Sequence, residues 1–229
     1  MVQVNNTKLF LRFRFKKQGS LQYISHLDLV RTMHKVIVRA KLPLWYTEGF
    51  NPKPKMIFAA PLSIGTESEC EFMDLRMNEY IDPTEAMARI NANMTSEMQI
   101  FEAYYPESKF TDLKWMSYRL KISALDINDE LVDKCNALFG SDTVDVAKKN
   151  SDQTINIRPL IKSAVAKREG NELVIDAILS ADPSAFLNPE YLIKAMRDKC
   201  GVLSSSDLLS ERYEIMRLNA YFGDMTEFR

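Results

Sequence analysis

The chain has 229 residues, of which 46% are apolar and 27% charged, and its 30 lysines and arginines face 31 acidic residues, for a formal net charge of −1. This composition is typical of a globular protein and excludes a disordered, a collagen-like or a coiled-coil chain. The charge is unevenly distributed: residues 1–60 carry a net charge of +9, residues 61–115 of −7 and residues 116–229 of −3.

The first half of the chain predicts a β-α-β-β-α-β succession. Residues 9–17 alternate phenylalanine with arginine and lysine, which predicts a strand with one basic face. A helix is expected over 25–41, with Ser25 as its N-cap and Pro43 beyond its end. The remaining elements are strands over 56–60 and 68–77, a helix over 82–93 and a strand over 98–105. This order is that of the ferredoxin-like motif.

The second half follows the same pattern. Strands are expected over 118–125, over 143–146 or 154–157, and over 161–167, 173–180 and 213–220, with helices over 128–139 and 188–200. We therefore predict an α+β protein of two ferredoxin-like units in tandem, the first over 1–115 and the second over 116–229.

Several classes of site have no support in the sequence. Its three cysteines, Cys70, Cys135 and Cys200, are too far apart to predict a disulfide framework or a metal site. No stretch approaches the roughly 20 apolar residues of a membrane span, and residues 1–6 lack the pattern of a secretory signal. We expect a cytoplasmic protein without membrane contact, metal or cofactor.

The helix over 25–41 predicts one apolar face and one basic row. Its apolar face consists of Leu29, Val30, Met33, Val36, Ile37 and Ala40. Arg31, Lys35 and Arg39 form the basic row at i, i+4 and i+8. A solvated helix face is the ordinary interpretation of such a row. The same 60 residues, however, also supply Arg12, Arg14, Lys16, Lys17, Lys53 and Lys55 with almost no acidic residues, which favours a binding surface.

The loop over 46–55 is the second candidate element of that surface. Pro52 and Pro54 stiffen it, and Gly49 permits a backbone conformation that other residues avoid. The side chains it can present are Tyr46, Phe50, Asn51, Lys53 and Lys55. Cations that neutralise phosphates, together with aromatic rings on which bases stack, are typical of single-stranded nucleic-acid binding. A phosphate-bearing cofactor or an acidic protein would use the same cations. The acidic row Glu67, Glu69 and Glu71 could instead neutralise them internally.

His26 and His34 are the chain's two histidines, and both lie on the basic helix. His26 lies near Asp28, which could hold it as a general base, and His34 flanks Arg31. A metal-independent ribonuclease needs a base for the 2′-hydroxyl and an acid for the leaving oxygen. Local capping or packing is the alternative role of each histidine. The catalytic candidates are therefore His26, His34 and Asp28, and catalysis itself stays open.

Two strings in this region resemble a bacterial family. They are Tyr23-Ile24-Ser25-His26-Leu27-Asp28-Leu29 and Tyr46-Thr47-Glu48-Gly49-Phe50-Asn51-Pro52-Lys53-Pro54-Lys55. The chain resembles the radical-SAM-linked protein family, whose members are encoded beside, or fused to, a radical SAM protein with a B12-binding-like region. The resemblance covers about residues 8–77 and implies a radical SAM partner but no catalytic residue. Family genes near those of an E/G-type ribonuclease and of ribosomal proteins imply a connection with RNA.

Three functional hypotheses follow. The leading one is a non-catalytic accessory protein of a radical SAM enzyme that binds RNA, or an RNA-containing substrate, through the basic N-terminal surface. The first alternative is a metal-independent endoribonuclease of tandem ferredoxin-like fold that uses His26 or His34. The second is a protein-interaction module that docks on the radical SAM partner.

Overall fold

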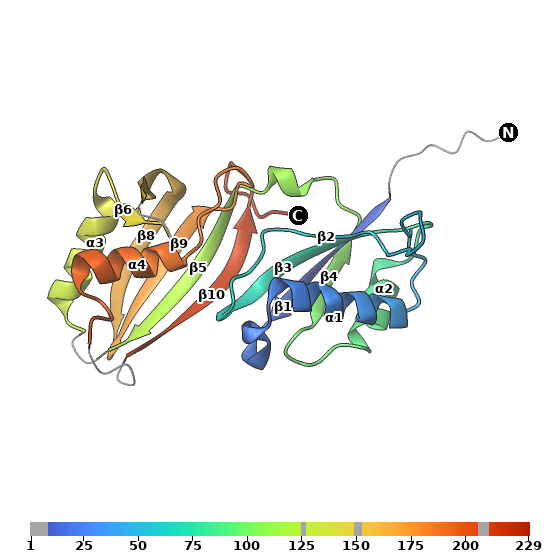
Figure 1. Ribbon diagram of the computed structural model, residues 1–229, viewed down its shortest axis with the longest axis horizontal. Helices are drawn as coiled ribbons and strands as arrows, with labels where there is room; N and C mark the ends of the chain where they lie inside the picture. Colours follow the sequence, from blue (N-terminus) through green and yellow to red (C-terminus); the bar gives the residue numbers. More distant parts are fainter. Residues whose placement is uncertain (1–8, 125–126, 149–152, 206–210) are drawn as a thin grey trace. The chain divides into compact units, whose positions relative to one another are not determined.

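The computed structural model describes residues 9–124, 127–148, 153–205 and 211–229 (Figure 1). It confirms the predicted α+β class. The chain divides into two compact units: unit 1 consists of Met1–Ile64, Ser68–Phe110 and Arg229, and unit 2 consists of Gly65–Glu67 and Thr111–Phe228. Over the described residues, every helix is too short or too polar to cross a lipid bilayer.

Unit 1 contains the elements predicted for the first half, with shifted ends. They are β1 (Phe10–Lys17), the 3-10 helix η1 (Gly19–Tyr23), α1 (His26–Arg39), β2 (Met56–Phe58), β3 (Thr66–Arg76), α2 (Pro83–Asn91) and β4 (Ile100–Tyr104). Along its sheet the strands follow the order β4-β1-β3, with β2 on the outer side of β3, and each of these pairs is antiparallel.

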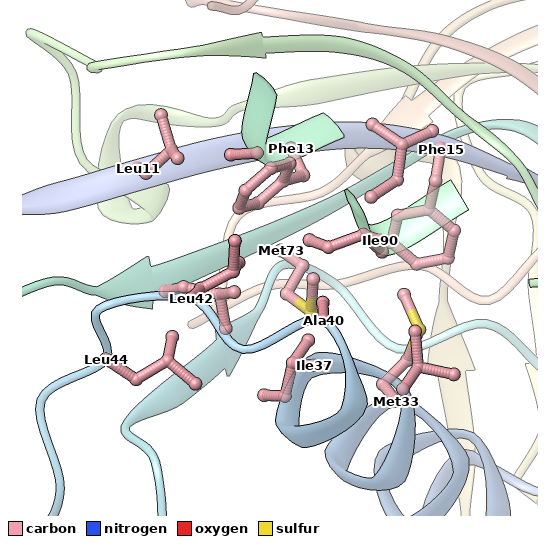
Figure 2. Packing of buried hydrophobic residues seen from close by; sticks show 14 of the residues in the cluster. Leu11, Phe13, Phe15, Met33, Ile37, Ala40, Leu42, Leu44, Met73 and Ile90 are labelled. Atoms are coloured by element: carbon pink, nitrogen blue, oxygen red, sulfur yellow. The ribbon is translucent and has the colours of Figure 1, made fainter. Parts of the chain in front are cut away.

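The core of unit 1 lies between one face of this sheet and its helices. Alternate residues of β1, Leu11, Phe13 and Phe15, are fully buried. Figure 2 shows the side chains of Phe13 and Phe15 directed toward α1, which contributes Met33 and Ile37 to the same cluster. Because side chains alternate across a strand, the intervening Arg12 and Arg14 must lie on the other face.

The basic face of β1 is not part of a solvent-exposed surface, which corrects the sequence-based interpretation. Arg12, Arg14 and Lys17 are buried. The Arg12 guanidinium donates through Nε and Nη2 to both carboxylate oxygens of Asp74, at 2.8 and 2.9 Å. Arg14 forms an ion pair of 2.9 Å with Glu102. Asp74 and Glu102 lie directly opposite these arginines on β3 and β4, so acids distant in sequence neutralise the face locally.

The N-cap predicted for α1 is confirmed. The Ser25 hydroxyl accepts a hydrogen bond of 3.1 Å from the Asp28 amide and donates one of 2.7 Å to the Asp28 carboxylate. We expect Ser25→Ala to lower the free energy of unfolding by about 1 kcal/mol, because the first-turn amides then lose their acceptor. Urea unfolding measures this change. Ser25→Asp, which restores an acceptor, is the matched control and should recover most of the loss; an alanine variant as stable as the wild type would contradict the cap.

Unit 2 contains β5 (Trp115–Ser123), α3 (Asp129–Gly140), β6 (Asp145–Ala147), β7 (Thr154–Asn156), the 3-10 helix η3 (Arg158–Leu160), β8 (Ile161–Glu169), β9 (Glu172–Ser180), α4 (Glu190–Cys200) and β10 (Arg212–Tyr221). Its sheet has the order β10-β5-β9-β8, again with antiparallel pairs. The two alternative strands near 143–146 and 154–157 both exist, because β6 and β7 pair with each other in a small separate sheet. Leu125, the predicted end of the first strand, lies outside the described residues.

In both units an asparagine side chain from a helix hydrogen-bonds to the backbone of the strand at one edge of the sheet. Asn91 of α2 accepts from the backbone amide of Ile100 in β4 and donates to its carbonyl, at 2.9 and 2.7 Å. Asn136 of α3 makes the same two bonds to Ala166 in β8, at 2.8 and 3.0 Å. Satisfied edge groups do not recruit another strand, so these edges are unsuited to strand addition at these positions.

Candidate functional site

α1 presents the basic row that the sequence predicted. The buried side chains of this helix are Leu29, Met33, Val36 and Ile37. With that face on the core, the side chains of Arg31, Lys35 and Arg39 are exposed. Neighbouring members of the row are separated by about 6 Å along the helix axis, since each residue rises 1.5 Å. The row is therefore a line of cations parallel to α1.

Four of the five candidate cations lack an acidic partner among the described residues. Arg31 forms an exposed ion pair of 3.4 Å with Asp28. Over the described part of the chain, Lys35, Arg39, Lys53 and Lys55 form no ion pair. The acidic row of β3 thus makes no salt bridge with these four side chains. Their charges remain available to an anionic ligand.

The loop over 45–55 is a short antiparallel hairpin. The Thr47 amide donates to the Lys53 carbonyl at 2.9 Å, the Lys53 amide to the Thr47 hydroxyl at 3.0 Å, and the Lys55 amide to the Trp45 carbonyl at 3.2 Å. Gly49, in the turn, has a φ of 119°, a backbone conformation strained for other residues. The hairpin follows the C-terminal end of α1 and leads into β2 (Figure 1). The sequence predicted its stiffness but not its pairing.

One face of the hairpin combines an aromatic ring with three cations. Residues directly opposite in an antiparallel pair share a face, which places Lys53 and Lys55 on the face of Trp45. Two backbone hydrogen bonds join the hairpin to the end of β3. The Trp45 amide donates to the Arg76 carbonyl at 2.9 Å, and the Arg76 amide donates to the Lys55 carbonyl at 3.0 Å. The Arg76 guanidinium lies 3.9 Å from the centre of the Trp45 ring. Sequence analysis missed Arg76, which lies within the acidic segment.

The hairpin turn exposes an aromatic side chain. Phe50 has 112% of its reference accessible surface, so it contacts almost nothing in the protein. Asn51 beside it is also exposed. Tyr46 lies opposite Pro54, on the other face of the hairpin, and is 42% exposed. All five loop residues selected from the sequence are therefore exposed, but they divide between two faces and the turn.

The two histidines are not arranged as an acid–base pair with Asp28. The His26 ring packs edge-on against Phe58, with 5.6 Å between ring centres. The Asp28 carboxylate instead accepts from Ser25 and pairs with Arg31. His34 is half-buried, and its Nε2 atom is buried without a hydrogen-bond partner. Within the described residues neither histidine donates to a carboxylate. His26 has the packing role that the sequence also allowed, and the role of His34 stays a prediction.

No cluster of three or more potential metal ligands occurs among the described residues. Cys70 and Cys135 are buried, Cys200 is partly buried, and none of the three forms a disulfide. The predicted burial is therefore confirmed for Cys70 and Cys135. The Cys70 sulfur also accepts a hydrogen bond of 3.7 Å from Arg14 Nη2.

These thiols should be unreactive in the folded protein. Burial raises the pKa of the Cys135 thiol to about 12, and burial also raises that of Cys200. At about pH 8 a thiol with that pKa is ionised in roughly one molecule in 10⁴. We expect an aromatic disulfide reagent to modify Cys135 slowly in the native protein and all three cysteines rapidly in urea. Equal rates for Cys135 in both states would contradict its burial.

Comparison with known protein families identifies the family of this chain. The model of a family described as "Uncharacterized protein conserved in bacteria (DUF2344)" matches residues 11–189. The chain belongs to this family. The matched region contains the basic helix row and the hairpin, and extends through most of unit 2. No curated protein matches the chain.

Solved structures give a comparison of fold for this DUF2344 member. A chain from a crystal structure of a Cbf5-Nop10-Gar1 complex is similar with a TM-score of 0.52 and 10% identity, over 95% of this chain and 50% of the other. Our chain thus spans about half the length of that match, which supports the α+β fold alone. An unknown protein from Galdieria sulphuraria aligns over 92% of this chain and 98% of its own, with 9% identity and a TM-score of 0.26.

Proposed function

We propose that this DUF2344 protein is a non-catalytic accessory protein that binds RNA, or an RNA-containing substrate, through a basic surface on unit 1. We define this basic surface as the helix row Arg31, Lys35 and Arg39 together with the hairpin residues Tyr46, Phe50, Asn51, Lys53 and Lys55. The observation that carries the proposal concerns four exposed cations, which have no acidic partner within the part of the chain that the structure describes. They lie on the same unit as a fully exposed aromatic ring.

Electrostatics favour a polyanion as the ligand. Each phosphate that a lysine or arginine neutralises releases condensed counterions, and this entropy gain drives association. A cation already paired with a carboxylate contributes less, because binding must first break that pair. Lys35, Arg39, Lys53 and Lys55 meet no such competitor among the described residues. Their spacing along a helix and a strand suits an extended phosphate backbone better than a single small anion.

We further propose that each unit is ferredoxin-like, so that the chain is a tandem of this motif with units close to 1–115 and 116–229. Two observations support this. The element order of unit 1 is β-α-β-β-α-β, and its strands pair in the order fourth, first, third, second. Unit 2 pairs its corresponding strands, β10, β5, β9 and β8, in the same order, with the β6–β7 hairpin inserted. Sheets of this motif serve other proteins as RNA platforms.

A radical SAM enzyme is the proposed partner, and the cytoplasm the proposed location. Support for the partner is the resemblance of the Ser25-His26-Leu27-Asp28 and hairpin strings to the radical-SAM-linked protein family. Residues of both strings also stabilise local structure: Ser25 and Asp28 cap α1, and Thr47 and Lys53 close the hairpin. Co-purification with and without nuclease distinguishes a partner held directly from one held through RNA.

Binding of labelled RNA across a salt series tests the proposal. The full-length protein is titrated into a fluorescein-labelled oligouridylate at several salt concentrations, and the anisotropy gives each dissociation constant. We expect affinity to fall steeply as salt rises, since counterion release weakens at high salt. Absence of binding at low salt, or binding that salt does not affect, would overturn the proposal.

A further inference from the structure

Phe50 differs from the other exposed apolar side chains of the protein. The next most exposed large apolar residues among those described, Tyr80 and Tyr23, retain 69% and 67% of their surface, against 112% for Phe50. The Tyr80 ring moreover stacks on Tyr105 at 5.1 Å. No ring contact involving Phe50 occurs within the described residues. Both faces of its ring are consequently accessible to a ligand.

The ring sits on a support that is ordered before binding. Two backbone bonds, and one bond from the Lys53 amide to the Thr47 hydroxyl, close the hairpin below the turn. Two more backbone bonds join its base to Arg76 of β3. Pro52 and Pro54 fix two further backbone torsions. The protein therefore loses little conformational entropy when a ligand binds Phe50. Such pre-organisation increases affinity.

The charges beside the ring identify the kind of ligand. Lys53 and Lys55 are exposed on the face of the hairpin that carries Trp45 and Arg76. In sequence order the cations begin three residues after the ring, so an extended ligand could place a planar group on Phe50 and anionic groups on the lysines. A nucleotide chain has this alternation of planar base and phosphate. An apolar protein pocket would accept the ring but would gain little from the lysines.

We propose that the hairpin binds single-stranded RNA, with an unpaired base stacked on Phe50 and neighbouring phosphates on Lys53 and Lys55. This inference rests on the proposed RNA-binding function and adds the class of RNA. In a duplex the faces of the bases are already stacked on each other, whereas a single strand can present them to an aromatic ring. Stacking on phenylalanine accepts every base, so the preference is for strand state rather than sequence.

The experiment compares a labelled oligouridylate of about 12 nucleotides, within the range of single-strand site sizes, with an RNA duplex of equal length. Wild type, Phe50→Ala and Phe50→Trp are titrated across the same salt series. We expect Phe50→Ala to weaken single-strand binding roughly 5- to 150-fold without changing the salt slope, since no charge is removed. Phe50→Trp should retain binding, and Tyr80→Ala, which changes an exposed ring outside the hairpin, should bind as the wild type does.

The outcomes separate this inference from the proposed function. Salt-dependent single-strand binding that is equal in wild type and Phe50→Ala would overturn the role of Phe50 and leave RNA binding intact. Duplex binding as tight as single-strand binding would overturn the class of RNA. Absence of binding to either RNA at low salt would overturn both proposals. Because Phe50 is fully exposed, the alanine variant should keep the wild-type circular dichroism spectrum and unfolding midpoint.

Discussion

Arg12→Ala is expected to destabilise unit 1 by about 3–5 kcal/mol, the cost of removing one partner from a buried ion pair. Arg12 is fully buried and donates to both oxygens of Asp74, which is itself buried. It also donates to the Ser108 hydroxyl at 2.8 Å and stacks over the Phe110 ring at 4.4 Å. Alanine would leave the Asp74 carboxylate buried without these compensating contacts.

The loss should depend on pH. Burial raises the pKa of Asp74, and the bond to Arg12 opposes that shift. Without Arg12 the folded-state pKa rises further, while the unfolded carboxyl still ionises near pH 4. A group with a raised folded pKa contributes stability at low pH and loses it as pH rises through that pKa. The deficit of Arg12→Ala should therefore shrink as the pH falls from neutral toward about 4.

Trp45 provides a readout confined to unit 1. The chain has two tryptophans, Trp45 in unit 1 and Trp115 in unit 2, so urea unfolding in a Trp115→Phe background follows Trp45 alone. Arg89→Ala, which removes an exposed i,i+4 ion pair with Glu85 in α2 of unit 1, is the control and should cost less than about 1 kcal/mol. Arg12→Leu with Asp74→Leu should recover much of the loss. An Arg12→Ala protein whose free energy of unfolding lies within about 1 kcal/mol of the wild-type value would contradict the assignment of Arg12 as a buried structural residue.

Replacing Lys35, Arg39, Lys53 and Lys55 together with glutamine is expected to weaken RNA binding by roughly 10²–10³-fold at about 0.1 M salt. Each of these side chains is exposed and free of ion pairs within the described residues. The slope of log binding constant against log salt concentration should also decrease in magnitude by about 3, because each of the four lost phosphate contacts contributes about 0.7 on a single strand. Anisotropy of labelled oligouridylate across a salt series measures both quantities.

A matched variant controls for the loss of net charge. Among its exposed lysines, unit 2 offers four that form no ion pair within the described residues, Lys121, Lys148, Lys162 and Lys199. Their replacement with glutamine changes the total charge by the same amount but leaves the basic surface of unit 1 intact. We expect this control to bind within about threefold of wild type, through the weaker long-range field alone. Equal losses in the two quadruple variants would show that net charge, and not this surface, determines affinity.

Local sequence patterns predicted the helix that carries the candidate site. The expected helix over 25–41 corresponds to α1 (His26–Arg39), and Ser25 caps it as expected. The orientation of its faces was also predictable, because the 3.6-residue period alone assigns Leu29, Met33 and Ile37 to the core and Arg31, Lys35 and Arg39 to solvent. Such information is contained within one element and does not depend on what packs against it.

The role of the β1 cations could not be predicted in this way. Alternation indicates that Arg12 and Arg14 share a face, but whether that face is open depends on which strands pair with β1 and in what register. The pairing brings Asp74, 62 residues away, and Glu102, 88 residues away, opposite these arginines. A segment charge of +9 therefore overstated the exposed basic surface, since part of it is neutralised inside unit 1.

Arg76 illustrates the opposite error. Because it lies in the acidic segment, it was not predicted to be a binding residue. The end of β3 nevertheless pairs with the hairpin, and the Arg76 guanidinium stacks on the Trp45 ring. The stiffness of the loop was predictable from Pro52, Pro54 and Gly49, because these residues restrict or permit torsions locally. Its pairing was not, since it depends on contacts with the end of a strand more than twenty residues further along the chain.

The salt dependence of single-strand RNA binding by the intact protein tests the central claim most directly. With five cations of the basic surface on phosphates, the logarithm of the binding constant should fall linearly with the logarithm of salt concentration, with a slope of about −3 to −4. The quadruple unit 1 variant should reduce the magnitude of that slope by about 3, which leaves only the contribution of Arg31. A wild-type slope near zero, or an unchanged slope in the variant, would contradict the claim that this surface binds RNA through its phosphates.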